Sequence, residues 1–217
     1  MRNKFWFIAL LFVASLVVPA SRAQATSLTF YQVSFDTSAL IGAGVFALDF
    51  QLNDGGSDPG SSEVTLSNFD FDTGSAGASL STGSGVTGSL ATGVTITDTD
   101  FFNQFLQEFT PGSVLSFTLG LGLGGSLATP DLFTLAIIDT NGTGVEIPTL
   151  SPFGTTFLEF LTGDTAPQAY ASAPGAFDVA APTVDPLVDT AVPEPTSMLL
   201  LGTGLAGVIG ARRRRAA

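Results

Sequence analysis

The chain has 217 residues, of which 19 are acidic and 7 basic, and it contains neither His nor Cys. Without these two residue types, zinc sites and Ser–His or Cys–His nucleophile systems are excluded, and disulfides cannot support the fold. The basic residues are Arg2, Lys4, Arg22 and Arg212 to Arg215, so none lies between residues 23 and 211. This excludes nucleic acid as a partner of the central region, because binding a polyanion requires basic side chains.

The first 25 residues have the pattern of a secretory signal peptide. Arg2 and Lys4 precede an apolar run from Phe5 to Val18, and Ala23 and Ala25 place small residues at cleavage spacing. We expect signal peptidase to cut after Ala25. A retained N-terminal anchor is the alternative, but this apolar run is short for a membrane span.

Residues 26–179 carry hydrophobic side chains at every second position, which is typical of half-buried strands. The clearest alternating runs are Tyr31–Phe35, Val45–Leu52, Val94–Ile96, Leu115–Leu121 and Phe133–Ile137. Clusters of Gly, Pro, Asn and Asp separate the runs and mark turns. We therefore predict one all-β domain over residues 26–179, an antiparallel β-sandwich of jelly-roll type.

Four other segments of this region are less regular. In Glu63–Asp72 the alternation slips between Leu66 and Phe69, which predicts a bulge. Ser75–Gly93 is rich in Gly, Ser and Thr and is expected to be a loop or a weak edge hairpin. Asp100–Phe109 fits either a helix or a strand, and we favour a short helix or irregular turn with Asp100 as N-cap. Ala176–Val179 is a candidate last strand.

Aromatic residues favour a packed core over a sugar-binding face. Sixteen Phe residues follow the signal peptide and occupy mostly alternating positions, whereas the only Trp, Trp6, lies within the signal peptide. Tyr31 and Tyr170 are the only tyrosines. Sugar-binding faces favour exposed Trp and Tyr rings, so we assign the Phe residues to the core.

Carboxylates are the only acid–base groups left for chemistry between residues 26 and 195. Asp70/Asp72 and Asp98/Asp100 are spaced so that a strand would place both members on one face, as a cation site or a glycosidase pair requires. A solvated strand face or a turn cap is the interpretation we favour for both pairs. No catalytic residue, cofactor or dedicated metal site is assigned.

Calcium remains a candidate partner of a more general kind. Asp139–Glu146 has oxygen ligands but lacks the EF-hand spacing, and an Asn-Gly turn explains it better. Because the acidic residues have no basic neighbours in sequence, we expect divalent cations to relieve their repulsion through loose binding at clusters such as Asp54/Asp58.

The C-terminal region has three parts in a fixed order. A Pro-rich segment at 180–192 is expected to be a linker, and Val192, Pro193, Glu194 and Pro195 begin the tail at 193–217. An uncharged stretch from Thr196 to Ala211 follows; as a single transmembrane helix it would be roughly 24 Å long at ~1.5 Å per residue. The cluster Arg212, Arg213, Arg214 and Arg215 would hold its end on the cytoplasmic side.

This order of motif, apolar segment and arginine cluster resembles the PEP-CTERM sorting tail of exported bacterial proteins. The resemblance implies recognition by the membrane transpeptidase exosortase and cleavage at or near Pro193–Pro195, with the catalytic cysteine in exosortase. A simple C-terminal membrane anchor is one alternative. The small residues of the apolar segment, Gly202, Gly204, Gly207 and Gly210, could also form a helix-dimerisation face.

Residues Asp98–Leu119 resemble a segment of one group of PEP-CTERM ectodomains without assigned activity. We therefore expect a non-enzymatic, exported cell-surface or extracellular-matrix protein, associated with extracellular polysaccharide. Its precursor would be held transiently in the inner membrane with the ectodomain outside. The alternative is a carbohydrate-binding module, or a glycan hydrolase that uses carboxylates alone.

Overall fold

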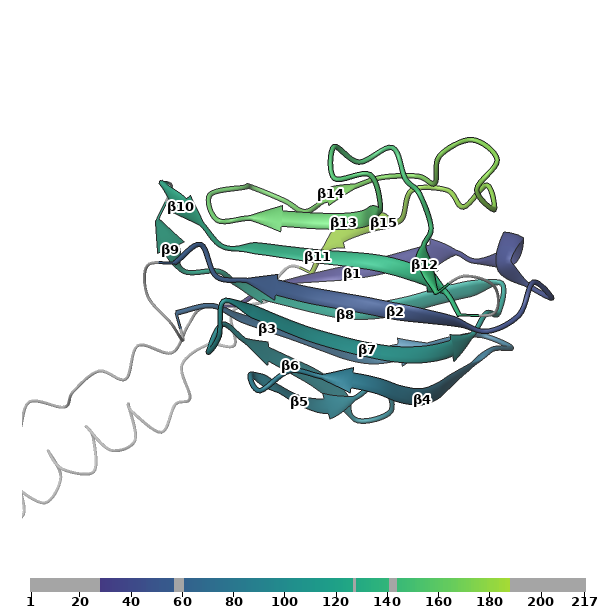
Figure 1. Ribbon diagram of the computed structural model, residues 1–217, viewed down its shortest axis with the longest axis horizontal. Helices are drawn as coiled ribbons and strands as arrows, with labels where there is room; N and C mark the ends of the chain where they lie inside the picture. Colours follow the sequence, from purple (N-terminus) through teal and green to yellow (C-terminus); the bar gives the residue numbers. More distant parts are fainter. Residues whose placement is uncertain (1–27, 57–60, 127, 141–143, 188–217) are drawn as a thin grey trace, which may run out of the picture.

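The computed structural model describes residues 28–56, 61–126, 128–140 and 144–187. Two antiparallel sheets pack face to face as a sandwich (Figure 1), which confirms the predicted all-β class and two-sheet architecture. The predicted signal peptide and transmembrane segment lie outside the described residues. Within the described ranges, no helix has the length and apolar character needed to cross a membrane.

One layer of the sandwich is a six-stranded sheet, counted over the described residues. Its strand order is β15-β1-β8-β3-β6-β5. The bounds are β1 Thr29–Asp36, β3 Glu63–Asp70, β5 Val86–Ser89, β6 Gly93–Thr97, β8 Val114–Gly122 and β15 Thr183–Pro186. The register between β3 and β8 shifts between Ser67 and Asp70, and Asn68 has a φ of 54°. This irregularity confirms the predicted bulge.

The second layer has seven strands within the same ranges, six of them in the order β14-β13-β11-β2-β7-β4, with β12 also paired to β11. The bounds are β2 Phe46–Asn53, β4 Ser75–Thr82, β7 Phe102–Thr110, β11 Leu132–Asp139, β12 Val145–Glu146, β13 Thr156–Leu161 and β14 Gln168–Ala169. Among the described residues, three short elements lie outside the two sheets: the 3₁₀ turn η1 Ser38–Leu40 and the strand pair β9 Gly125–Ser126 and β10 Thr129–Pro130.

Phenylalanine dominates the space between the sheets. Phe50 of β2 lies near the centre and meets Phe117 of the opposite sheet edge to face, with 5.7 Å between the ring centroids. The fully buried rings are those of Phe35, Phe46, Phe50, Phe105, Phe109, Phe117, Phe133 and Phe157. The assignment of Phe to the core holds for these residues, whereas Phe101 and Phe153 are exposed. Truncation of a buried ring to Ala typically costs about 3–5 kcal/mol.

The expected helix or irregular turn at 100–109 is wrong, because Phe102–Thr110 forms strand β7 along the whole length of β2. Phe105 and Phe109 point into the core, as they would from either a helix or a strand. The inward positions beside them hold Asn103 and Gln107, which are buried and polar. These two side chains hid the period-two pattern in the sequence.

The segment 75–93 also differs from its expected form as a loop or a hairpin. It contains β4, at the edge of the seven-stranded sheet, and β5, at the edge of the six-stranded sheet. The segment therefore lies at sheet edges, as the hairpin alternative expected, but β4 and β5 do not form a hairpin because the chain changes sheets between them. The burial pattern of β4 shows why the sequence signal was weak, since nearly all of its side chains are exposed.

The sandwich continues past the predicted domain boundary at residue 179. β15 lies within the expected linker and pairs antiparallel with β1, from Tyr31 opposite Pro186 to Ser34 opposite Thr183. Proline is tolerated there because β15 is an edge strand, where a missing backbone donor breaks no ladder. Ala176–Val179 is not a strand, since Phe177 and Asp178 both have positive φ and form a turn.

Candidate metal centre

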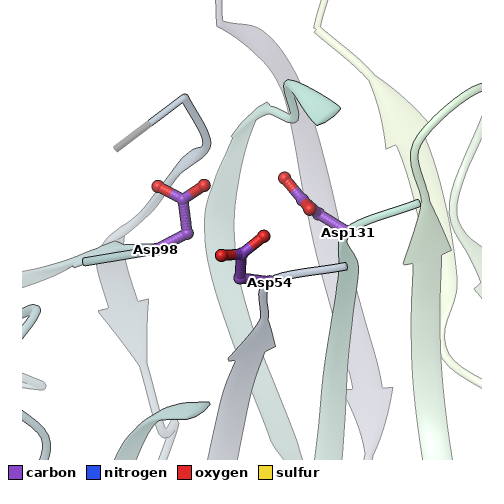
Figure 2. Close-up of side chains that lie close together, drawn as sticks. All are labelled: Asp54, Asp98 and Asp131. Atoms are coloured by element: carbon purple, nitrogen blue, oxygen red, sulfur yellow. The ribbon is translucent and has the colours of Figure 1, made fainter. Parts of the chain in front are cut away.

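Three buried aspartates meet at one end of the sandwich. Asp54 follows the last residue of β2, Asp98 follows the last residue of β6, and Asp131 precedes the first residue of β11. One carboxylate oxygen from each lies within 4.8 Å of the others. Figure 2 shows the three carboxylates turned toward a common space. The cluster therefore combines residues from both sheets that lie far apart in the sequence.

Asp131 is held by hydrogen bonds to both of its carboxylate oxygens. The Gly55 amide donates to Oδ1 over 2.9 Å, and the Ser62 hydroxyl donates to Oδ2. Ser62 in turn accepts a hydrogen bond of 2.7 Å from the Gly124 amide. Both Asp131 and Ser62 are buried, at 0% and 1% exposure. The orientation of this carboxylate is thus fixed by the surrounding backbone and hydroxyl groups.

Asp54 is fixed by the tight turn that follows β2. Its Oδ1 accepts a 2.7 Å hydrogen bond from the Gly56 amide, and its own amide donates to the Phe101 carbonyl over 3.0 Å. The turn needs Gly at position 55, because a Cβ there would lie 2.3 Å from the Thr129 carbonyl oxygen. Asp54 and the residues next to it are therefore pressed against the chain that leads into Asp131.

Asp98 has the least satisfied carboxylate of the three. Its side chain is 0% exposed, and its Oδ1 has no hydrogen-bond partner among the described residues. Its Oδ2 has one long contact, 3.4 Å from the Ser61 hydroxyl. Buried polar atoms are normally hydrogen-bonded, and a buried charge without a partner is costly. This oxygen is thus available to a ligand.

An open cleft of about 340 Å³ shares Ser61 and Gly124 with the surroundings of the cluster. None of the three aspartates lines this cleft. A group of carboxylate and hydroxyl oxygens suits a hard cation such as Ca²⁺ or Mg²⁺. The arrangement offers no nucleophile paired with a base of the Ser–His kind.

Neither of the two acidic pairs identified from the sequence, Asp70/Asp72 and Asp98/Asp100, places its two carboxylates side by side on one strand face. Asp98 and Asp100 both follow β6 in a turn instead of sharing a strand face, and Asp98 is buried whereas Asp100 is exposed. Asp70 and Asp72 are both exposed, and Asp70 Oδ1 accepts a 2.9 Å hydrogen bond from the Asp72 amide. The interpretation of this second pair as a turn cap is confirmed. Asp58 lies outside the described residues.

The calcium-like loop from Asp139 to Glu146 joins two paired strands. Asp139 of β11 is opposite Val145 of β12, and the Gly144 amide donates to the Asp139 carbonyl over 3.0 Å. This pairing supports the turn interpretation for the residues that the structure describes there. The sequence offered little sign of Asp131, whose position directly before a buried strand is its one distinguishing feature.

Two carboxylates of the seven-stranded sheet are already engaged by neighbouring side chains. The Gln51 side-chain amide donates to Asp49 Oδ2 over 2.8 Å, and the Gln104 side-chain amide donates to Oδ1 and Oδ2 of the same residue over 2.9 and 3.1 Å. Burial raises the pKa of the Asp49 carboxyl. The Tyr170 hydroxyl donates to Glu159 over 2.7 Å, and this hydrogen bond raises the pKa of Tyr170 to about 12. Neither carboxylate belongs to the aspartate cluster.

The family of the PEP-CTERM protein-sorting motif matches residues 191–215. The chain carries a PEP-CTERM sorting motif. The match includes the predicted processing residues Val192, Pro193, Glu194 and Pro195 and the cluster Arg212–Arg215. Proteins with this motif are exported and processed by exosortase at the membrane. No curated protein and no solved structure matches the chain.

The residues predicted to act in sorting lie outside the part of the chain that the structure describes. This applies to Val192–Pro195, to Arg212–Arg215 and to the signal-cleavage residues Ala23 and Ala25. The described chain ends at Leu187, whose amide donates to the Phe30 carbonyl over 2.8 Å. The sandwich thus reaches almost to the first residue of the PEP-CTERM motif.

Proposed function

We propose that the chain is the precursor of a non-catalytic cell-surface or extracellular-matrix protein, sorted by exosortase and associated with extracellular polysaccharide. The observation that carries this proposal is the PEP-CTERM motif at 191–215, which directly follows a β-sandwich whose last strand ends at Pro186. The sandwich is then the part that is displayed or released. No second folded unit separates it from the motif, since only residues 187–190 lie between them.

The proposed route begins with removal of residues 1–25 by signal peptidase after Ala25. The apolar segment of the tail then holds the precursor in the inner membrane, with the sandwich outside and Arg212–Arg215 on the cytoplasmic side. Exosortase cleaves at or near Pro193–Pro195. The mature protein leaves the membrane for the cell surface or the polysaccharide layer.

We assign the sandwich to the jelly-roll type. From β1 to β4 the chain enters the two sheets alternately, and β7 and β8 again lie in opposite sheets. As a result β1 pairs with β8 in one sheet and β2 pairs with β7 in the other. The first strands of the segment from β1 to β8 are thus neighbours of its last strands in both layers. Such nesting is expected when a long antiparallel ribbon folds over into two sheets.

Two buried carboxylates of the seven-stranded sheet support a non-catalytic role. Asp49 is 2% exposed and Glu159 is 5% exposed, and amide or hydroxyl donors occupy both side chains. A glycosidase needs two carboxylates that face the substrate from either side of the bond to be cleaved. The carbohydrate-binding alternative would instead need exposed aromatic rings beside polar groups, and a glycan array with the purified protein tests it.

Processing can be tested by replacing Pro193, Glu194 and Pro195 together with Ala. We expect the variant to accumulate in the inner-membrane fraction with Arg212–Arg215 still attached, whereas the native chain yields a shorter species by intact mass spectrometry. Native protein in cells that lack exosortase is the matched control and should behave like the variant. Recovery of the same mature mass from all three samples would refute exosortase processing.

A further inference from the structure

We propose that Asp54, Asp98 and Asp131 bind one calcium ion that joins the two sheets at the end of the sandwich where β1 begins and β15 ends. The site is separate from the sorting function, since none of its residues belongs to the PEP-CTERM motif. It also differs from loose charge relief, because it specifies one ion, three ligands and one location.

The spacing of the carboxylates fits a single ion. Oxygen ligands lie about 2.3–2.6 Å from calcium, so two ligands on opposite sides of the ion are about 4.6–5.2 Å apart. One oxygen from each of Asp54, Asp98 and Asp131 lies within 4.8 Å of the other two. The three oxygens can therefore all reach one central ion without a rearrangement of the backbone.

Asp98 supplies independent evidence for a ligand. Its carboxylate is completely buried, and its Oδ1 has no hydrogen-bond partner among the described residues. Asp131, by contrast, receives donors on both oxygens, and these donors orient it toward the common space. An ion between the carboxylates would supply the missing partner of Asp98, while the existing hydrogen bonds hold the other ligands in place.

The part of the chain that the structure describes has no basic side chain to offer this cluster. No Lys, Arg or His lies between residues 23 and 211. Three carboxylates at 7%, 0% and 0% exposure are therefore placed close together, and residues 28–56, 61–126, 128–140 and 144–187 contain no basic side chain that could pair with them. Buried carboxylates are stabilised by an opposite charge or by a metal. A bound cation would supply that opposite charge.

The chemistry of the ligands favours calcium over other ions. The available donors are all oxygens, which excludes ions that prefer His or Cys. Magnesium requires nearly ideal octahedral geometry and keeps several waters, whereas calcium accepts irregular sets of six to eight oxygens. Here the ligands come from three separate chain segments, with Ser61 and Ser62 beside them. Such a mixed and irregular set suits calcium.

The location of the site gives the ion a structural role. Asp54 and Asp131 flank strands of the seven-stranded sheet, and Asp98 follows a strand of the six-stranded sheet. β1 begins and β15 ends at this same end of the sandwich, as Thr29 lies opposite Leu121 and Tyr31 opposite Pro186. Calcium would thus fasten both sheets close to the point at which the chain continues into the sorting motif.

The test measures calcium binding and thermal unfolding on the purified protein and on Asp98→Asn. For the native protein we expect one equivalent of calcium by calorimetry, with a Kd of about 10⁻³ M or tighter. At free calcium about 100 times Kd, the melting temperature should rise by about 5–10 °C over its value in chelator. Sodium chloride of matched ionic strength should give a smaller rise.

Asp98→Asn should lower the calcium affinity at least about tenfold and abolish most of the calcium-dependent rise. In chelator the same variant should melt at or above the native temperature, because it removes one of three like charges. This reversal separates a ligand from a residue that merely supports the fold. Asp185→Asn removes an exposed carboxylate from β15 and is the matched control; it should keep the native calcium response.

Asp54→Asn is the second variant, and it too should lose the response to calcium. The proposal is overturned if calcium and sodium chloride have equal effects, or if either variant keeps one tight equivalent of calcium. An Asp98→Asn protein that melts far below the native protein in chelator also overturns it, since Asp98 would then act in the fold without an ion. An equal response to magnesium at the same concentration overturns the assignment to calcium.

Discussion

The hydroxyl of Ser62 donates a hydrogen bond to the carboxylate of Asp131, and both side chains are buried. Ser62 directly precedes β3 of the six-stranded sheet, and Asp131 directly precedes β11 of the seven-stranded sheet. This one contact therefore connects the two layers of the sandwich. Because Ser62 also accepts from the Gly124 amide over 2.7 Å, it satisfies a backbone donor at the same time.

The first prediction is that Ser62→Ala destabilises the protein by about 1–3 kcal/mol, the usual cost of leaving buried polar groups without partners. Two groups lose their partner, Asp131 Oδ2 and the Gly124 amide. Urea unfolding followed by circular dichroism measures the change. Ser81→Ala, at an exposed position of β4, is the control and should change stability by less than about 0.5 kcal/mol. A Ser62→Ala protein as stable as this control would contradict the prediction.

The sequence predicted most of the sandwich because most strands show a simple alternation. In β2 and β8 large apolar side chains occupy every inward position, so periodicity alone identified both strands. β7 was missed because Asn103 and Gln107 face the core, where Gln107 accepts from the Leu90 amide and donates to the Gly77 carbonyl. A polar side chain with buried backbone partners cannot be recognised before those partners are known.

β15 was missed for a different reason. Pro182 directly precedes this four-residue strand and Pro186 is its last residue, so the strand falls in a Pro-rich stretch typical of a linker. Only pairing with β1 makes this stretch a strand, and that pairing joins segments from opposite ends of the domain. Local sequence carries little information on such a contact, because a four-residue edge strand buries little side-chain area.

The aspartate cluster shows what sequence spacing can and cannot reveal. Asp98 was paired with its near neighbour Asp100, yet the structure places it beside Asp54 and Asp131. The usable signal was positional: each of the three aspartates directly adjoins the end of a strand at the same end of the sandwich. That signal becomes informative only when the register of the strands is known, since register decides which strand ends meet.

The second prediction concerns the two tyrosines. A hydrogen bond to Glu159 is the main cause that raises the pKa of Tyr170 to about 12, and burial raises the pKa of Tyr31. Absorbance at the tyrosinate band should therefore show that less than half of the tyrosine side chains are ionised at pH 10, the usual pKa of tyrosine. The only Trp in the chain is Trp6, in the predicted signal peptide, so mature protein should give a signal from these two side chains alone.

Tyr170→Phe isolates Tyr31 in this titration and removes the step near pH 12. Because the folded-state pKa of Tyr170 lies above its unfolded value, its contribution to stability is complete below about pH 10 and is lost as the pH rises through about 12. The difference in unfolding free energy between native protein and Tyr170→Phe should therefore shrink over this range. A native titration with one ionisation near pH 10 for each tyrosine would contradict the assigned hydrogen bond.

The third prediction concerns Asp49, whose pKa is raised mainly by burial even though the amides of Gln51 and Gln104 oppose the shift. A raised folded-state pKa means that the folded protein binds the proton more tightly than the unfolded chain. The stability linked to this carboxyl is therefore present below its ordinary pKa of 3.8 and is lost as the pH rises through the raised folded-state value. Asp49→Asn removes the ionisation and should gain stability relative to the native protein as the pH rises from 3 to 7.

Asp36→Asn is the matched control with the opposite sign. The hydroxyl of Ser38 lowers the pKa of the exposed Asp36, so the stability linked to this carboxyl is present above pH 3.8 and lost as the pH falls through its lowered folded-state pKa. The two variants should thus change the pH dependence of the unfolding free energy in opposite directions. Urea unfolding measures this free energy, and a chelator in the buffer keeps cations from the aspartate cluster. Parallel curves of unfolding free energy against pH for native protein and Asp49→Asn would contradict the prediction. They would show that Asp49 ionises as easily in the folded protein as in the unfolded chain, despite its burial between β7 and β11.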